Sequence, residues 1–302
     1  MKNKIMTVTI GIPAYNEERN IVSLISCLLK QAQTIFRLKK IIIANDASTD
    51  KTIAVLKKIK NPLVKVFNNK VRKGKLFRMN QIISRTESDI LVILDADILI
   101  RDINFLNKLI MPIILNKADL TSASIKELKP ITLMQKILAA SMEFKKNIFE
   151  EYKKGNNIYT CHGRARAFSK KLFITLFVPF RFFDIAGDDA FSYLYCKYHH
   201  YKYKFIKKAV VSYKLPTNFS DHQKQSLRFF LSKKELSKKF NKEFIKAEYY
   251  LPPSLILKSF ILSIYINPLI IVYFLIAFVL KIRSLFNYKS TPIWSVASSS
   301  KI

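Results

Sequence analysis

An uninterrupted apolar run that ends in two carboxylates constrains the fold of this chain more than any other feature. Ile90 to Leu94 are five apolar residues, and Asp95 and Asp97 follow them directly. Such a run is typical of a strand buried on both faces in a parallel sheet. Ligands bind at the carboxyl ends of such strands, so we expect these carboxylates to serve chemistry rather than stability. Paired hard oxygens favour Mg²⁺ or Mn²⁺ bridged to a phosphorylated ligand; a surface turn that merely favours Asp is the alternative.

Three further strand–helix units come before this run. The expected strands cover residues 7–12, 40–44, 64–67 and 90–94, and helical patterns separate them. This alternation predicts a parallel sheet with right-handed crossovers, and its strand order would be 3-2-1-4 if the sheet has the usual doubly wound arrangement. Strands one, two and four would then direct residues 13–17, Asp46 and the Asp95/Asp97 pair into one cleft, and the basic loop 72–75 would approach from the third strand.

Composition leaves several kinds of partner open. The chain has 302 residues, and its 52 Lys and Arg against 21 Asp and Glu give a net charge of +31. Such an excess predicts an anionic partner, which phospholipid, nucleic acid and phosphorylated substrates all satisfy. Neither a G-x-x-x-x-G-K-[ST] nor a G-x-G-x-x-G motif occurs, which argues against a P-loop ATPase and a dinucleotide dehydrogenase. Three cysteines without a C-x-x-C imply no disulfide framework and suit a reduced, cytosolic catalytic domain.

Four motifs, in order and at these spacings, resemble the donor-binding half of the family 2 glycosyltransferases, which have the GT-A fold. They are Ile12-Pro-Ala-Tyr-Asn-Glu17, Asn45-Asp-Ala-Ser-Thr-Asp50, Arg72-Lys-Gly-Lys75 and Asp95-Ala-Asp97. The resemblance covers roughly residues 5 to 100. It implies an α/β fold with a mostly parallel sheet flanked by helices. Asn45 and Ala47 stand where the family often has Asp and Gly, which leaves the nucleotide base open.

The resemblance also implies roles for individual residues. The donor nucleotide sugar would be bound by Pro13, Ala14, Tyr15, Asn16, Glu17, Asp46, Lys73, Lys75, Asp95 and Arg228. Asp95 and Asp97 would hold Mn²⁺ or Mg²⁺ with the diphosphate. Arg228 belongs to Gln225-Ser-Leu-Arg-Phe229, which resembles the family's Q-x-x-R-W motif with Phe in place of Trp. Its planar guanidinium would face the departing diphosphate, and Gln225 the acceptor.

The acceptor half carries weaker signals. Residues 132–152 have the apolar spacing of a long helix, and residues 160–168 resemble the family's glycine-containing strand below the sugar site, with Gly163 allowing close approach to a ligand. Asp188 and Asp189 then open a helix. By resemblance Asp189 would be the catalytic base; Asp188, or a plain helix cap, is the competing interpretation. A base here takes the proton of the acceptor hydroxyl during an inverting transfer.

The last third of the chain predicts membrane attachment. Apolar residues alternate with lysines over 227–247, a basic amphipathic pattern suited to an anionic membrane surface; a charged helix packed on the domain is the alternative. Residues 259–280 carry no charge and would span roughly 33 Å as one helix, unless Asn267-Pro268 divides them into two shallow segments. The expected organisation is a catalytic domain at 1–215, with nucleotide-sugar and acceptor halves at 1–100 and 101–215, an interface segment at 216–253, a membrane segment at 254–283 and a loosely ordered tail at 284–302.

These features predict a membrane-attached glycosyltransferase with its catalytic domain on the cytoplasmic side. It would move a sugar from a nucleotide diphospho-sugar to a membrane-associated glycan or lipid acceptor, with inversion and with Mn²⁺ or Mg²⁺. Within the enzyme class the alternative is a polyprenyl-phosphate sugar transferase. A nucleic-acid-binding or scaffold protein is an alternative from another class, but the basic residues are spread along the chain and form no nucleic-acid-binding module. An inactive relative that binds ligands without catalysis is a third alternative.

Overall fold

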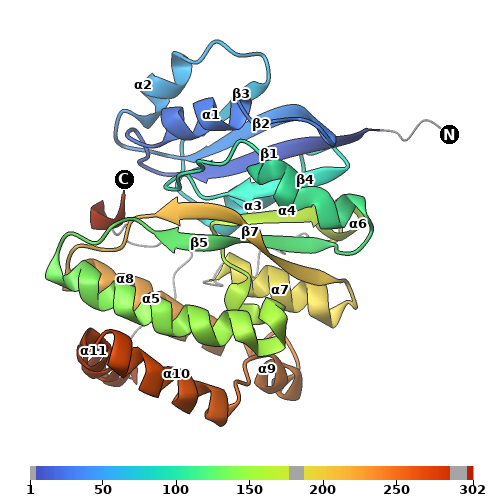
Figure 1. The fold of residues 1–302 in the computed structure, drawn as a ribbon. Helices are drawn as coiled ribbons and strands as arrows, with labels where there is room; N and C mark the ends of the chain where they lie inside the picture. Colours follow the sequence, from blue (N-terminus) through green and yellow to red (C-terminus); the bar gives the residue numbers. More distant parts are fainter. Residues whose placement is uncertain (1–4, 177–186, 286–297, 302) are drawn as a thin grey trace.

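A computed structural model describes residues 5–176, 187–285 and 298–301 of the chain. Its centre is a seven-stranded sheet in the order β3-β2-β1-β4-β6-β5-β7 (Figure 1). The strands are β1 (Met6–Ala14), β2 (Phe36–Asp46), β3 (Val64–Asn69), β4 (Ile90–Leu94), β5 (Leu120–Glu127), β6 (Ala165–Ser169) and β7 (Tyr203–Tyr213). The first four strands pair in parallel in the predicted order 3-2-1-4. β6 runs antiparallel to both of its neighbours, and β5 and β7 pair in parallel.

Strand β4 is buried on both faces, as its apolar run predicts. Ile90, Val92 and Leu94 face one hydrophobic core, whereas Leu91 and Ile93 face the other. This alternation follows from the two-residue period of a strand, which sends neighbouring side chains to opposite faces. Polar side chains have no place along β4, so the first carboxylates after it fall at the edge of the sheet.

Helices cover both faces of the sheet. The core that contains Ile90 is covered by α1 (Ile21–Leu29), α2 (Thr52–Lys57) and α4 (Phe105–Ile114). The opposite core is covered by α3 (Lys75–Ile83), α6 (Lys170–Phe173) and α7 (Asp188–Tyr198). Short 3₁₀ turns η1 (Tyr152–Gly155) and η2 (Ile158–Thr160) lead into β6.

The long helix α5 (Leu133–Glu151) lies between the sheet and a third layer. A capping box at Thr132 and Gln135 starts it, so the predicted helix over 132–152 is confirmed. On its far side lie α10 (Pro253–Ile266) and α11 (Leu269–Leu285), packed through Phe144, Ile148 and Ile270 (Figure 1).

The uncharged stretch 259–280 forms two helices and not one, which is the alternative that the Asn267-Pro268 pair had left open. Helix α10 ends at Ile266 and α11 begins at Leu269, on either side of the Asn267-Pro268 break. At about 1.5 Å per residue the two helices are roughly 21 and 25 Å long, shorter than a hydrocarbon core of about 30 Å. By length and composition alone, the stretch Lys242–Ile266 could cross a membrane, but the chain leaves the helical conformation within it, between Glu248 and Pro253.

Three details refine or correct the sequence expectations. The basic, aromatic sequence of residues 197–208 was expected to lead into a strand at 209–213, but strand β7 already begins at Tyr203. The 227–247 segment belongs to two helices, α8 (Phe219–Leu236) and α9 (Lys242–Glu248), and its apolar residues Leu236 and Ile245 are buried in the core with α7, as the alternative of packing on the domain has it. They are buried because a second apolar surface, that of α7, lies within reach of them in the fold. Of the tail expected to be loose, residues 298–301 have defined contacts, beginning with a turn at η4 (Ser298–Ser300).

Gly11 in the middle of β1 leaves room for helix α3. A Cβ at this position would lie 2.4 Å from Ile82 Cγ2 and 2.9 Å from Ile93 Cδ1. We expect Gly11→Ala to lower the free energy of unfolding by about 1–3 kcal/mol through overpacking, measured by urea denaturation. The double variant Gly11→Ala/Ile82→Ala should show a favourable coupling energy, because Ile82→Ala removes the nearest colliding atom and leaves only the contact with Ile93. Purely additive losses would contradict the steric explanation.

Candidate active site

The site lies at the edge where the parallel strands end. β1, β2 and β4 finish there at Ala14, Asp46 and Leu94. Because β6 is antiparallel, it starts at the same edge, with Ala165 opposite Leu94. The N–H of Asp95 donates to the carbonyl of Arg164 at 2.9 Å, which ties the acidic loop after β4 to the turn before β6. The strand ends that were expected to meet therefore do lie at one edge of the sheet.

Lys75 connects the two acidic groups of this edge. Its ammonium lies 2.6 Å from Asp95 Oδ1 and 3.1 Å from Asp188 Oδ2. It also donates to the carbonyl of Gly163 at 3.4 Å. Burial opposes its charge, but Asp188 and Asp95 together keep the pKa of Lys75 above the ordinary value. The first turn of α3 thus brings Asp95, Asp188 and Gly163, distant in sequence, within reach of one cation.

Asp188 and Asp189 lie in different electrostatic environments. They occupy the first turn of α7, and Gly187 before them has φ 103°, a left-handed conformation that glycine adopts without steric cost. Burial alone would raise the pKa of Asp188, but Lys75 and Arg166 hold it below the ordinary value. Burial, and then the charge of Asp188, raise the pKa of Asp189. Asp188 is therefore a stable anion, and Asp189 is the better proton acceptor of the two.

Arg166 on β6 is the buried partner of Asp188. Its side chain is fully buried and donates to the Asp188 carbonyl at 2.7 Å, to Ser192 Oγ at 2.8 Å and to Asp188 Oδ2. These bonds fix the start of α7 against the sheet. Sequence reasoning missed this residue, although a charged side chain among small apolar ones in Ala165–Phe168 was a signal for it.

Asp95 and Asp97 fit the requirements of a divalent cation. Both are half-buried. Burial, and next the charge of Asp95, raise the pKa of Asp97, so the pair holds negative charge that a cation would offset. Among the described residues, no group of three or more His, Cys, Asp or Glu side chains could hold a metal, so other ligands would come from water and phosphate oxygens.

The first motif forms a strained turn after β1. Asn16 has φ 56°, a left-handed conformation that Asn tolerates better than most residues, and its side chain holds the 45–50 loop by accepting from Thr49 N at 2.8 Å. The guanidinium of Arg72 lies 3.7 Å above the Tyr15 ring. Glu17 is buried, and burial followed by the charge of Asp97 raises its pKa to about 7.

Asp46 holds the basic loop in place. Its carboxylate accepts from the backbone N–H groups of Lys73 and Gly74, each at 2.8 Å, and from Arg78 Nε at 2.7 Å. Lys73 directs its ammonium over the Phe77 ring at 4.5 Å. Of its four acceptor positions, Asp46 thus uses three within the protein. Its assigned contact with the nucleoside stays a prediction.

The remaining predicted residues lie around this centre. Pro13 and Ala14 end β1. Gly163 precedes β6; a Cβ on it would lie 3.3 Å from Lys75 Nζ and 3.4 Å from Asp189 Oδ2. Gln225, on α8, donates to Ser300 Oγ at 3.4 Å. The side chain of Arg228 lies outside the described residues.

One contact had no signal in the sequence. Lys301 places its ammonium on the first motif, 2.8 Å from Glu17 Oε1 and 3.0 Å from the Tyr15 carbonyl. No spacing or motif in the sequence connects position 301 with position 17.

Comparison with known proteins identifies the family. A model of "Glycosyl transferase family 2" matches residues 9–177, more than half of the chain. The chain belongs to glycosyl transferase family 2. It is therefore a glycosyltransferase, and the predicted family and enzyme class are confirmed. No curated protein matches the sequence.

Solved glycosyltransferases share the fold of this family 2 chain at low identity. A mannosyltransferase, PcManGT from Pyrobaculum calidifontis, solved with GDP-Man and Mn²⁺, has a TM-score of 0.67 at 14% identity, over 94% of this chain and 88% of its own. S. aureus TarS 1–349 has a TM-score of 0.54 at 16% identity, covering 87% and 72%. Glucosyl-3-phosphoglycerate synthase from Mycobacterium tuberculosis, solved with Mn²⁺, UDP and glucosyl-3-phosphoglycerate, has 0.52 at 15%, covering 77% and 79%. These likenesses confirm the predicted GT-A fold.

Proposed function

We propose that this glycosyltransferase transfers a sugar from a nucleotide diphospho-sugar, with inversion, to a glycan or lipid acceptor at a membrane. The observation that carries the proposal is the junction at Lys75. This cation touches Asp95, on the side proposed for metal and diphosphate, and lies beside Gly163 and Asp189, on the side proposed for the sugar and acceptor. Donor and acceptor chemistry thus share one point at the edge of the sheet.

The donor side is assigned to the first motif and the acidic loop. Residues 13–17 and Asp46 would bind the nucleoside, with the Arg72–Lys75 loop and Arg228 on the phosphates. Asp95 and Asp97 would hold Mn²⁺ or Mg²⁺, and the relatives solved with Mn²⁺ and GDP-Man or UDP support this. Bound there, the cation would offset the negative charge that grows on the departing diphosphate.

Asp189 is assigned the proton transfer. Its carboxylate takes the proton of the acceptor hydroxyl while that oxygen attacks the anomeric carbon. The bond from that carbon to the diphosphate oxygen breaks on the opposite face, and the nucleoside diphosphate leaves. The raised pKa of Asp189 suits a base, because a pKa nearer the working pH makes proton transfer more favourable. Asp188, paired with Lys75 and Arg166, positions the helix instead.

The membrane side is assigned to α10 and α11. Their outer faces expose large apolar side chains in the described part of the chain: Ile256, Leu257, Ile261, Leu262, Tyr265, Ile266, Ile271, Val272, Leu275, Phe278, Val279 and Ile282. Soluble monomers rarely expose so many large apolar side chains on two neighbouring helices. Lys258, Lys281 and Arg283 border this surface and are exposed, which suits an anionic bilayer. Because both helices are shorter than a bilayer core and pack on α5, we propose that they lie in the interface.

A donor screen tests the assignment. The purified full chain is offered a panel of nucleotide diphospho-sugars, with Mn²⁺ and with EDTA, and with lipid extract, soluble glycans or polyprenyl phosphate as separate acceptor sources. Released nucleoside diphosphate and glycosylated acceptor are measured. We expect release from one class of donor, dependent on the metal and on the lipid fraction. Glycosylation of soluble acceptors alone would contradict the membrane acceptor, and release that EDTA does not affect would contradict the metal. Transfer onto a bare polyprenyl phosphate would establish the alternative transferase.

Asp97→Asn separates the metal site from the fold. We expect turnover at saturating donor to fall steeply and the Mn²⁺ concentration for half-maximal rate to rise. Thermal stability should not fall, because a carboxylate whose pKa is raised in the folded state is less favourable there, as an anion, than in the unfolded chain. Mn²⁺ titration of the rate, together with thermal unfolding, measures both. If the variant lost thermal stability together with turnover, Asp97 would have a structural role and not a metal-binding one.

A further inference from the structure

The 298–301 segment lies across the donor site. It comes from the far end of the chain, yet its contacts join the first motif to α8. The Ser299 N–H donates to Asp221 Oδ2 at 2.9 Å, and Ser299 Oγ accepts from Thr217 N at 3.2 Å. Lys214 Nζ donates to the Lys301 carbonyl at 3.1 Å. Ser299 therefore anchors the segment near α8, and Lys301, two residues later, extends its side chain to the first motif.

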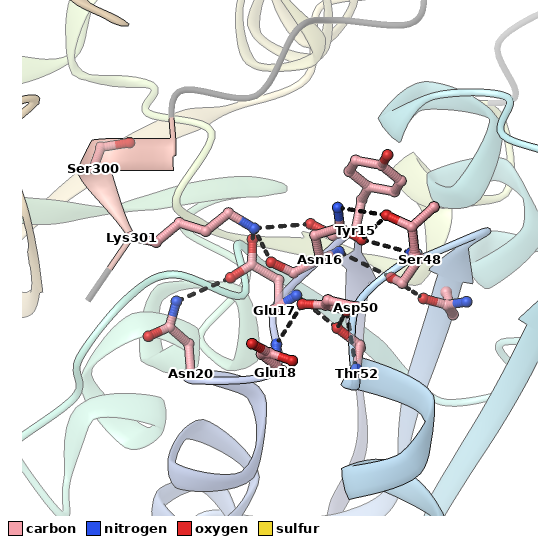
Figure 2. Close-up of polar contacts among 12 residues, drawn as sticks. Tyr15, Asn16, Glu17, Glu18, Asn20, Ser48, Asp50, Thr52, Ser300 and Lys301 are labelled. Atoms are coloured by element: carbon pink, nitrogen blue, oxygen red, sulfur yellow. Dashed lines mark hydrogen bonds and ion pairs between the residues drawn. The ribbon is translucent and has the colours of Figure 1, made fainter.

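Lys301 satisfies the hydrogen-bond acceptors of the first motif. Figure 2 shows its side chain reaching toward Tyr15, Asn16 and Glu17. The ammonium donates to the Tyr15 carbonyl at 3.0 Å, to the Asn16 carbonyl and to Glu17 Oε1 at 2.8 Å. The second oxygen of Glu17 accepts from Asn20 Nδ2 at 2.9 Å. The side chain of Lys301 is 17% exposed and that of Glu17 10%, so this contact is largely shielded from water.

The geometry decides between two roles for this lysine. An ammonium has three N–H donors, and here all three meet protein oxygens. None is left for a phosphate, so in this arrangement Lys301 does not help to bind the donor. Carbonyl and carboxylate oxygens on a turn at the carboxyl end of β1 are the acceptors that the hydroxyl groups of a nucleoside would use, and the ammonium occupies them.

We propose that the 298–301 segment is an internal competitor of the nucleotide, with Lys301 in the place of the nucleoside's hydroxyl groups. The proposal rests on the assignment of residues 13–17 to donor binding. The segment and the nucleotide exclude each other, so the apparent affinity for nucleotide falls by the fraction of molecules in which the segment is displaced.

Two variants release the segment by different routes. Lys301→Met keeps the length and the apolar stem but removes the donors. Ser299→Pro removes the N–H that binds Asp221 and leaves Lys301 and the first motif unchanged. Lys117→Met, an exposed lysine before β5, is the control for the change in net charge. Binding of UDP and of GDP to the full chain with Mn²⁺ is measured by titration calorimetry.

We expect Lys301→Met to lower the dissociation constant about tenfold, as the loss of a charge-assisted competing contact predicts. Ser299→Pro should change it in the same direction, and Lys117→Met should leave it unchanged. Weaker binding by Lys301→Met would make Lys301 a donor-binding residue and overturn the inference. Equal affinities in all four proteins would also overturn it, while leaving the proposed function intact. Absence of binding by wild type and by both release variants would refute the proposed donor site itself, and the inference with it.

Discussion

Asp189→Asn is expected to lower kcat on the order of 10²- to 10⁴-fold, the usual contribution of a general base. The amide keeps the size of the side chain but cannot take a proton from the acceptor hydroxyl. Nucleoside diphosphate binding should remain, because the proposal places Asp189, beside Gly163, at the sugar and acceptor and not at the diphosphate. Stability should not fall, since burial and Asp188 make the charged form of Asp189 unfavourable in the folded protein.

The pH profile gives a second measurement of the same role. In wild type the rate should fall as the pH is lowered through the pKa of Asp189, which is raised by burial and by Asp188. In Asp189→Asn this acidic limb should disappear from the residual rate. Glu87→Gln, which changes an exposed carboxylate paired with Lys39 before β4, is the matched control and should leave turnover unchanged. A variant Asp189→Asn with wild-type kcat would remove this residue from the chemistry.

Arg166→Met should produce the largest loss of stability, about 3–5 kcal/mol, the usual result of removing one partner from a buried ion pair. The variant leaves Asp188 buried beside Lys75 without the guanidinium, and it leaves the Asp188 carbonyl without that donor. Ser192 Oγ keeps its bond to the same carbonyl at 2.6 Å, so the start of α7 is weakened rather than lost. Urea denaturation, with the slope compared between variants, measures the difference.

Lys108→Met is the matched control for this loss. Lys108 also pairs with an aspartate, Asp102, at 2.6 Å, but the two side chains are 42% and 32% exposed. An ion pair open to solvent contributes about 0–1 kcal/mol. If Arg166→Met lowered the free energy of unfolding no more than Lys108→Met does, burial would not explain the stabilising effect of the Arg166–Asp188 pair. The difference in pKa between Asp188 and Asp189, which we attribute to this buried pair, would then need another explanation.

Local patterns in the sequence were sufficient to predict much of the fold. The run Ile90–Leu94 predicts a strand buried on both faces. Side chains alternate between the two faces of any strand, so five apolar residues in a row make both faces apolar. The series of strand–helix units predicts a parallel sheet with right-handed crossovers, and the order 3-2-1-4 was expected only on the condition that the sheet has the usual doubly wound arrangement, which it has. The apolar spacing over 132–152 and the break at Asn267-Pro268 are likewise local, and a helix and a break appear at those positions. For residues 227–247 the local pattern left two interpretations open, a membrane surface or packing on the domain, because the apolar surface of α7, against which Leu236 and Ile245 are buried, is not visible from that segment.

The sequence by itself therefore determined the parallel series of strands and helices, the edge at which the acidic residues gather and the family of enzymes. Only the tertiary structure decided which member of the Asp188–Asp189 pair is held by cations, that Arg166 is its buried partner, and that Lys301 reaches the first motif. The physical reason is that hydrogen-bonding period and steric limits act between residues a few positions apart. The pairing of charges and the burial that shifts their pKa values depend on residues that become neighbours only after the chain has folded.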